Sequence, residues 1–267
     1  MTEEDSKPAD FSLETLKTCF EACLGKDNVL YIDKYILGKL VKRILIGNQS
    51  PIRMTLKLER QAYVNIDFDH VLLNPKANNV IESVAGYDEL FKFLNLLGTV
   101  FGWVASDVEA KLAIIRGHRS GEQADKYESV QSMLAHEIET NMIKPKAKDS
   151  TTGTRNLLRL HRALEYIISF LEGVPALENQ EKCCGMSQEA YKKTLMKFHP
   201  WVVQKAAMMA MHMLPTKEGL IQKICDAPDE DKIKEVTKTL EEAIQAMQKV
   251  YEITQELYKE KDLLSLP

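Results

Sequence analysis

Residues 154–173, TRNLLRLHRALEYIISFLEG, decide the fold class of this chain. We predict one long helix here that ends at Gly173, because a glycine followed closely by a proline, here Pro175, is typical of a helix C-terminus. The segments around it are mostly helical in pattern as well, and neither repeats nor parallel-strand signals occur. The sequence therefore predicts an all-α protein of seven or eight helices.

Further helical segments flank this stretch in both directions. Their apolar residues recur at three- and four-residue spacing, the period of a helix with one buried face. The expected segments are 9–24, a helix starting near residue 28, 87–116, 123–142, a helix opening at 187 and ended by Pro200, a short helix after Pro215, and 229–260. Proline lacks the amide donor that a helix interior needs, so His199 is expected at a helix junction.

Residues 37–86 differ from the rest of the chain. Met54, Leu56 and Leu58 alternate with polar residues, and a second alternating run covers residues 64–68. Alternation is the period of a β-strand, which predicts a β-like hairpin in this insert. Disorder and a translated intervening segment are the alternatives.

Composition bounds the class of protein. Over 267 residues, 35 basic and 39 acidic residues are interspersed and give a net charge of −4, so no nucleic-acid partner is expected. Residues 1–8 form an acidic N-terminus that we expect to be disordered and that lacks the apolar core of a secretory signal. No apolar run approaches the roughly 20 residues that cross a membrane. We therefore expect a cytoplasmic protein that contacts membranes only transiently.

The sequence contains none of the common motifs of catalytic or metal-binding sites. We find no nucleophile elbow, no phosphate-cradling glycine loop and no zinc-binding histidine pair, and we predict neither an enzyme nor a cofactor or metal. The five cysteines are an odd number, as in a reducing compartment. Cys19 and Cys23 lie four apart and are expected to be small buried residues rather than metal ligands.

Two sets of charged residues lie on helical faces. Asp107 and Lys111 are four apart and share one face, either as a solvated ion pair or as part of a ligand site. Arg155, Arg159 and Arg162 fall at i, i+4 and i+7, which predicts one stripe of guanidinium groups. Guanidinium groups suit the oxygens of a phosphate monoester. The alternative is a solvent-facing stripe paired with acids elsewhere in the fold.

The tripeptide His199-Pro200-Trp201 marks the start of another helix. Pro200 suits the first position of that helix and leaves His199 at its positive end, where the imidazole can donate to a carbonyl oxygen. A purely structural role is the alternative. His161 stands among leucines and is expected to be a core histidine bonded to a carbonyl. Trp103 and Trp201 are explained either by core packing or by contact with an interface or ligand.

Taken together, these motifs resemble the glycolipid transfer protein superfamily, in particular its ceramide-1-phosphate branch. The matching residues are Asp107-Val108-Glu109-Ala110-Lys111, Arg155 with Arg159, His199-Pro200-Trp201, residues 93–101, residues 158–164 and the closing LLSLP of residues 263–267. The likeness covers residues 9–36 and 87–267. In relatives that bind sugar headgroups, Asn and Trp stand where this chain has Lys111 and Arg155, which favours phosphate over sugar.

The resemblance implies a two-layer helical sandwich of about eight helices with an apolar pocket. It implies a single lipid-transfer domain over residues 9–267, interrupted by the insert at about 37–86, and a monomer that carries ceramide-1-phosphate between membranes. The alternatives are a sphingolipid sensor or adaptor without net transfer, a carrier of another phospholipid such as phosphatidic acid, a glycolipid carrier, and a helical interaction scaffold.

The resemblance also implies roles for individual residues. Asp107 would accept the amide N–H of the lipid and His199 would donate to its C=O. Lys111, Arg155 and Arg159 would bind the phosphate, with Arg162 as a further contact. Leu13, Phe101 and Trp103 match apolar positions of the family's pocket, with core packing as the alternative.

Overall fold

The computed structural model describes residues 11–24, 29–30, 53–58, 62–67, 83–98, 101–143, 151–225 and 229–267. Its elements, with η marking 3₁₀ turns, are α1 (Leu13–Cys23), β1 (Arg53–Leu58), β2 (Ala62–Asp67), α4 (Ser83–Leu96), α5 (Gly102–Arg119), η4 (Ala124–Tyr127), α6 (Val130–Glu139), α7 (Gly153–Gly173), η5 (Val174–Ala176), α8 (Cys184–Lys193), η6 (Met196–Phe198), α9 (Trp201–Ala210), η7 (Met211–Met213), α10 (Lys217–Ile224) and α11 (Glu230–Glu260). Residues 1–8, which we expect to be disordered, lie outside the described residues. Of the helix expected to start near residue 28, only residues 29–30 are described.

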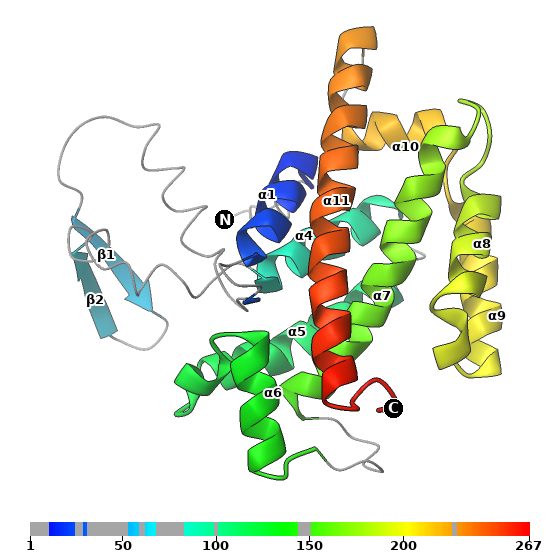
Figure 1. The fold of residues 1–267 in the computed structure, drawn as a ribbon. Helices are drawn as coiled ribbons and strands as arrows, with labels where there is room; N and C mark the ends of the chain where they lie inside the picture. The colour runs from blue at the N-terminus through cyan, green and yellow to red at the C-terminus, as the bar shows by residue number, and fades with distance from the viewer. Residues whose placement is uncertain are drawn as a thin grey trace, which may run out of the picture.

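Helix α7 is the central element of the fold. Figure 1 shows α7 and α11 side by side, with α4 and α5 crossing behind them and α8 and α9 on the far side of α7. The apolar residues of α7, which include Leu160, Leu164 and Phe170, are buried among these neighbours. The prediction for residues 154–173 is confirmed, because α7 ends at Gly173 as expected.

A buried carboxylate closes the N-terminus of α7. Glu137 of α6 is 0% exposed, and its side chain accepts hydrogen bonds from the backbone N–H of Gly153 at 2.7 Å and of Thr154 at 3.0 Å. The hydroxyl of Tyr127 donates to the same carboxylate at 3.0 Å. The free amides of a helix N-terminus need acceptors, and Glu137 supplies them where the side chain of Thr152 does not cap the helix.

Three predicted helices have different bounds in the structure. The single helix expected over 87–116 is wrong, because α4 starts at Ser83 and ends at Leu96, and α5 begins at Gly102. Gly98 between them has φ +123°, a left-handed conformation that an α-helix cannot include and glycine tolerates. The segment 123–142 contains η4 and then α6. Helix α8 covers Cys184–Lys193, so it begins before residue 187 and ends well before Pro200, with η6 between. The capping box of Ser129 explains the start of α6.

The insert contains the expected hairpin. β1 and β2 pair antiparallel, with Leu56 opposite Val64 and Met54 opposite Ile66. The strand period predicted for the two alternating runs is therefore confirmed for residues 53–58 and 62–67, and this pairing has no bearing on the alternative of a translated intervening segment. The rest of this insert lies outside the described residues.

His161 is a core histidine, as predicted. It is 2% exposed, and its Nε2 lies 2.8 Å from the side-chain carbonyl Oε1 of Gln255 on α11. The ring stacks on Tyr251, with centroids 4.3 Å apart. Burial lowers the pKa of His161 to about 4, so the ring is neutral at pH 7.

This burial predicts a pH-dependent loss of stability. In the unfolded chain His161 titrates near its ordinary pKa of 6.5, so below that pH the unfolded state binds the proton more readily than the folded state. The contribution is intact above the unfolded pKa and is lost as the pH falls towards 4. We expect the free energy of unfolding to be about 2 kcal/mol lower at pH 5 than at pH 7 because of this residue. Urea denaturation of the wild type and of His161→Phe should show a flatter pH dependence in the variant; identical slopes would contradict the assignment.

None of the helices in the described ranges combines the length and apolar character that a membrane-spanning segment needs.

Candidate functional site

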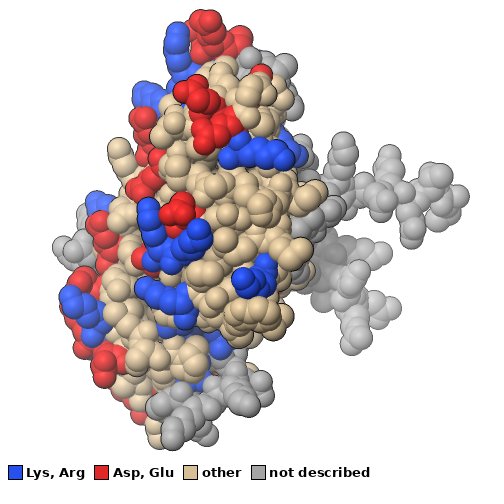
Figure 2. Space-filling view, turned by 90° about the vertical axis from the view of Figure 1, so that its right-hand side faces the viewer, with Lys and Arg blue, Asp and Glu red and all other residues tan. Residues whose placement is uncertain are grey.

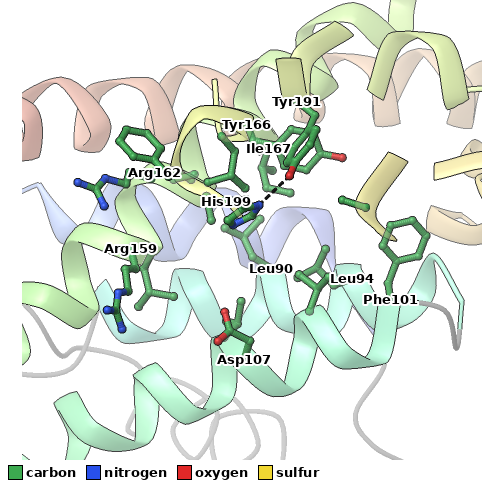
Figure 3. Close-up of a pocket in the computed structure, with 18 of the residues that line it drawn as sticks. Leu90, Leu94, Phe101, Asp107, Arg159, Arg162, Tyr166, Ile167, Tyr191 and His199 are labelled. Carbon is green, nitrogen blue, oxygen red and sulfur yellow. Dashed lines mark hydrogen bonds between the residues drawn. The ribbon is translucent and has the colours of Figure 1, made fainter. Parts of the chain in front are cut away.

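A cavity of about 480 Å³ opens between α4, α5, α7, α8 and α9. Its walls are mainly aliphatic and aromatic and include Leu90, Leu94, Phe101, Leu164, Ile167 and Phe170. Charged and polar residues line it too, and Figure 3 shows Arg159 and Arg162 on the side of the cavity away from Phe101, with Asp107 and His199 between. The cavity therefore has an apolar interior and a polar rim, as a binding site for an amphiphile requires.

Asp107 and Lys111 form both an ion pair and part of the rim. The Nζ of Lys111 lies 2.5 Å from Oδ1 of Asp107, and both residues line the cavity. The side chain of Lys111 is 13% exposed and that of Asp107 is 65% exposed. The two alternatives drawn from the sequence are thus compatible, since the paired carboxylate and ammonium remain accessible to a ligand.

The three arginines of α7 do not form one stripe along the cavity. Arg159 and Arg162 line the cavity, whereas Arg155 is 2% exposed and lies outside its lining. The charge of Arg159 acts on both Arg155 and Arg162, as expected of three arginines on one helix face, but the first turns of α7 are buried and so Arg155 is covered. Burial, and after it the nearby charge of Arg159, lower the pKa of Arg155.

The other two arginines also contact the C-terminal segment. Nη2 of Arg162 donates to the carbonyl oxygens of Leu264 at 2.9 Å and Leu266 at 2.7 Å. Nη2 of Arg159 lies 3.4 Å from the carbonyl oxygen of Pro267. Arg162 thus holds the C-terminal segment in place. Arg159 makes only the longer contact, so its guanidinium is the more available of the two for binding a ligand at the rim.

His199 lies at the helix junction, as predicted, with extended backbone just before Pro200. Its Nδ1 is 2.7 Å from the hydroxyl of Tyr191 on α8. Burial lowers the pKa of His199, Asp107 opposes this shift and Lys111 adds to it. When the Tyr191 hydroxyl donates to Nδ1, the neutral ring carries its proton on Nε2 and can donate to a carbonyl oxygen.

Sequence reasoning missed Tyr191. The only signal was a tyrosine eight residues before His199, which says nothing about the angle at which α8 meets the following loop. In the structure Tyr191 is 1% exposed and also lines the cavity. A Tyr191 hydroxyl that donates to Nδ1 favours the tautomer of His199 that carries its proton on Nε2.

Replacing Tyr191 by phenylalanine should lower lipid binding about fivefold to tenfold, the value of one neutral hydrogen bond. The ring keeps its packing in Tyr191→Phe, but the proton of His199 is no longer held on Nε2. The measurement is equilibrium binding of a fluorescent form of ceramide-1-phosphate, the lipid that the family resemblance implies, beside a thermal melt that should be nearly unchanged. Wild-type affinity in the variant would remove Tyr191 from the site.

The three apolar positions expected at the pocket have different places. Phe101 lines the cavity and is 5% exposed. Leu13 lies on α1 in the hydrophobic core and outside the cavity lining, so the core-packing alternative holds for it. Trp103 belongs to α5, but its side chain lies outside the described part of the structure.

Comparison with known proteins places this arrangement in a family. The sequence model of the glycolipid transfer protein (GLTP) family matches residues 80–226. The chain is 35% identical to the human ceramide-1-phosphate transfer protein over 201 residues, which is 74% of this chain and 89% of that protein. It is 36% identical to the zebrafish (Danio rerio) protein of the same name over 186 residues, 69% of this chain and 86% of that one.

Solved structures show the same fold. The crystal structure of the human ceramide-1-phosphate transfer protein in complex with 12:0 ceramide-1-phosphate aligns with a TM-score of 0.72 and 27% identity, covering 96% of this chain and 100% of that one. A structure that describes how FAPP2 selects simple glycosphingolipids with the GLTP fold aligns with a TM-score of 0.59 and 26% identity, over 67% of this chain and 84% of that one. The match to the family model and the identity to the human protein show that the chain belongs to the glycolipid transfer protein family.

Proposed function

We propose that this protein binds ceramide-1-phosphate and transfers it between cytosol-facing membranes. The observation that carries the proposal is the cavity, in which Lys111 and Arg159 stand at the rim of a largely apolar interior. Relatives that share about a third of the sequence are named for this lipid, and one solved relative holds it. A phosphate monoester and two hydrocarbon chains need this combination of cations and apolar walls.

The headgroup contacts follow from the chemistry of each group. Asp107 accepts the amide N–H of the lipid, and His199 donates from Nε2 to its carbonyl oxygen. Lys111 and Arg159 bind the phosphate oxygens directly. Arg155 supports them through its positive charge beneath Arg159, because it lies outside the cavity lining. Arg162 contributes charge at the rim while it holds the C-terminal segment.

The apolar interior explains how a lipid can leave a bilayer. Each methylene exposed to water costs about 0.8 kcal/mol, so a two-chain lipid needs an equivalent apolar environment at every stage. The leucines and phenylalanines of the cavity supply that environment. We propose a monomeric carrier, because one cavity accepts both parts of the lipid.

The outer surface beside the cavity has the properties of a transient docking face. Four large apolar side chains on α9 and η7 are mostly exposed: Trp201 at 69%, Val202 at 69%, Met209 at 73% and Met213 at 64%. Figure 2 shows uncharged side chains over much of this side of the molecule, with scattered Lys and Arg and with Asp and Glu mainly along the left edge and toward the top. The packed-core alternative for Trp201 is therefore wrong. An indole suits the boundary between lipid and water, and a small apolar patch binds membranes weakly and reversibly.

Replacing Trp201 by alanine should reduce the partitioning of the protein onto phosphatidylcholine vesicles by about fivefold, since most of an exposed aromatic contact is lost. Liposome sedimentation measures this directly. Ile233→Ala is the matched control, because Ile233 is an exposed apolar residue of α11, at 38%, outside α9 and η7. Equal losses in both variants would argue against a specific docking face.

A transfer assay between vesicles tests the proposed function. Donor vesicles carry fluorescent ceramide-1-phosphate, phosphatidic acid or glucosylceramide in separate experiments, and acceptor vesicles carry none. The proposal expects rapid transfer of ceramide-1-phosphate and slow transfer of the glycolipid. Binding without transfer would favour a sensor or adaptor instead.

A further inference from the structure

The apolar part of the lipid cavity contains tyrosine hydroxyls that differ in their partners. Tyr87, Tyr166 and Tyr191 all line the cavity. The hydroxyl of Tyr191 lies 2.7 Å from Nδ1 of His199, and that of Tyr166 lies 2.7 Å from Oγ of Ser187. The hydroxyl of Tyr87 makes no hydrogen bond with any residue that the structure describes. Tyr87 is therefore the tyrosine of this cavity whose hydrogen-bonding capacity is open to a ligand.

The hydroxyl of Tyr87 is buried but can still be reached. The residue is 7% exposed, and its ring packs edge-on against Phe20 with centroids 5.9 Å apart. Its oxygen is not among the described polar atoms that are both fully enclosed and without a partner, so it keeps surface that a small group can touch. The cavity that Tyr87 lines provides the space for such a group. Buried polar groups are nearly always satisfied, so this hydroxyl indicates a missing partner.

The protonation state of this hydroxyl defines what the partner can be. Burial, and after it the nearby Cys23, raise the pKa of Tyr87. The phenol therefore stays neutral at physiological pH, where it can donate one hydrogen bond and accept another. A second neutral hydroxyl meets both requirements, whereas a hydrocarbon chain meets neither.

Helix α4 places Tyr87 near the headgroup end of the cavity. Figure 3 shows Leu90 level with His199 and Asp107, and Leu94 farther along the cavity, away from the arginines. Tyr87 precedes Leu90 by three residues, about 4.5 Å along the helix axis, and lies on the same face of α4 but in the direction opposite to Leu94. In the proposed function the rim holds the amide of the lipid, so the carbons that pass Tyr87 are those close to the amide.

We propose that Tyr87 is a specificity-determining residue that hydrogen-bonds a hydroxyl group on the lipid chains close to the amide, so that the protein prefers hydroxylated forms of ceramide-1-phosphate. This inference rests on the proposed function. The hydroxyl can stand on the second carbon of the acyl chain or on the fourth carbon of the sphingoid base, and the chemistry at Tyr87 is the same for both. A site with a buried hydrogen-bonding group discriminates against ligands that leave that group unpaired.

Competition among three lipids tests the proposal. Fluorescent ceramide-1-phosphate bound to the full chain is displaced by unlabelled ceramide-1-phosphates of equal chain length: one without a chain hydroxyl, one with a 2-hydroxyacyl chain and one built on 4-hydroxysphinganine. The wild type should bind at least one hydroxylated lipid about fivefold more tightly than the plain lipid, the value of one neutral hydrogen bond. Tyr87→Phe keeps the ring on Phe20 and should bring the three affinities together. The hydroxylated lipid that loses its advantage identifies the position of the chain hydroxyl.

Tyr166→Phe is the matched control. It removes a hydroxyl from the same cavity, but one that is already bonded to Ser187, so the preference for the hydroxylated lipid should persist. A thermal melt of Tyr87→Phe should show a midpoint no lower than that of the wild type, because no internal hydrogen bond is lost. A lower midpoint would reveal a partner for the hydroxyl within the protein and would overturn the proposal.

The outcomes separate this inference from the proposed function. Equal affinities of the three lipids for the wild type, or a preference that survives Tyr87→Phe, would overturn the role of Tyr87 and leave the binding of ceramide-1-phosphate intact. Loss of the preference in Tyr166→Phe to the same extent as in Tyr87→Phe would also overturn it. Failure of all three lipids to displace the fluorescent lipid would contradict the proposed function and this inference together.

Discussion

Replacing Lys111 by alanine is expected to lower the rate of ceramide-1-phosphate transfer by about 10- to 100-fold, because a charge-assisted hydrogen bond to phosphate contributes roughly 1.5–3 kcal/mol. The side chain of Lys111 is 13% exposed and lines the cavity, where water competes less for the phosphate than on an open surface. Arg159→Ala should have an effect of the same size, because Arg159 also lines the cavity and its contact with the carbonyl oxygen of Pro267, at 3.4 Å, is long. Vesicle transfer assays measure both variants.

The loss should be functional rather than structural. Asp107 is 65% exposed, so removing its partner costs at most about 1 kcal/mol of stability. Lys126→Ala is the matched control, because it breaks the exposed pair with Asp125 on η4, away from the cavity. Transfer at the wild-type rate in Lys111→Ala and Arg159→Ala would refute the phosphate site.

Replacing Glu137 by alanine should lower the free energy of unfolding by about 4 kcal/mol. The change leaves two backbone amides of α7 and the hydroxyl of Tyr127 without an acceptor in a buried place. Each buried donor left unpaired costs roughly 1–3 kcal/mol, and a domain has only about 5–15 kcal/mol in total. The midpoint of urea denaturation should fall sharply with little change in the slope.

Glu139→Ala serves as the control for this measurement. Glu139 ends the same helix two residues later but is exposed, so its removal should change stability by less than about 0.5 kcal/mol. Similar midpoints for the two variants would mean that Glu137 does not close the N-terminus of α7.

The bounds of the long helices could be predicted where local signals mark their ends. Gly173 and Pro175 end α7, and Asp229 caps α11 by accepting from the amide of Lys232 at 2.8 Å. The break between α4 and α5 gave a weaker signal. Apolar residues on both sides of it, such as Leu94 and Phe101, line the same cavity, so the helical period continues although the helix does not.

The identity of most site residues could be predicted from the sequence, but their positions and burial could not. Asp107, Lys111, Arg159 and His199 meet at one cavity, as expected from their spacing and from the family resemblance. The burial of Arg155 depends on which helices cover the first turns of α7. The spacing of residues along one helix predicts which of them share a face, but not which other helices pack on that face. The place of Tyr191 likewise depends on how α8 packs against the loop that carries His199.

The ion pair between Asp107 and Lys111 has a consequence for discrimination between ligands. A lipid that offers both an amide and a phosphate replaces the pair completely, giving the carboxylate a new donor and the ammonium a new acceptor. Phosphatidic acid has no amide, so it draws Lys111 away and leaves Asp107 with water alone. Because that carboxylate is 65% exposed, water compensates in part. With the proposed headgroup contacts, we therefore expect the rim to bind sphingoid lipids more tightly than glycerol lipids, by degree and not absolutely.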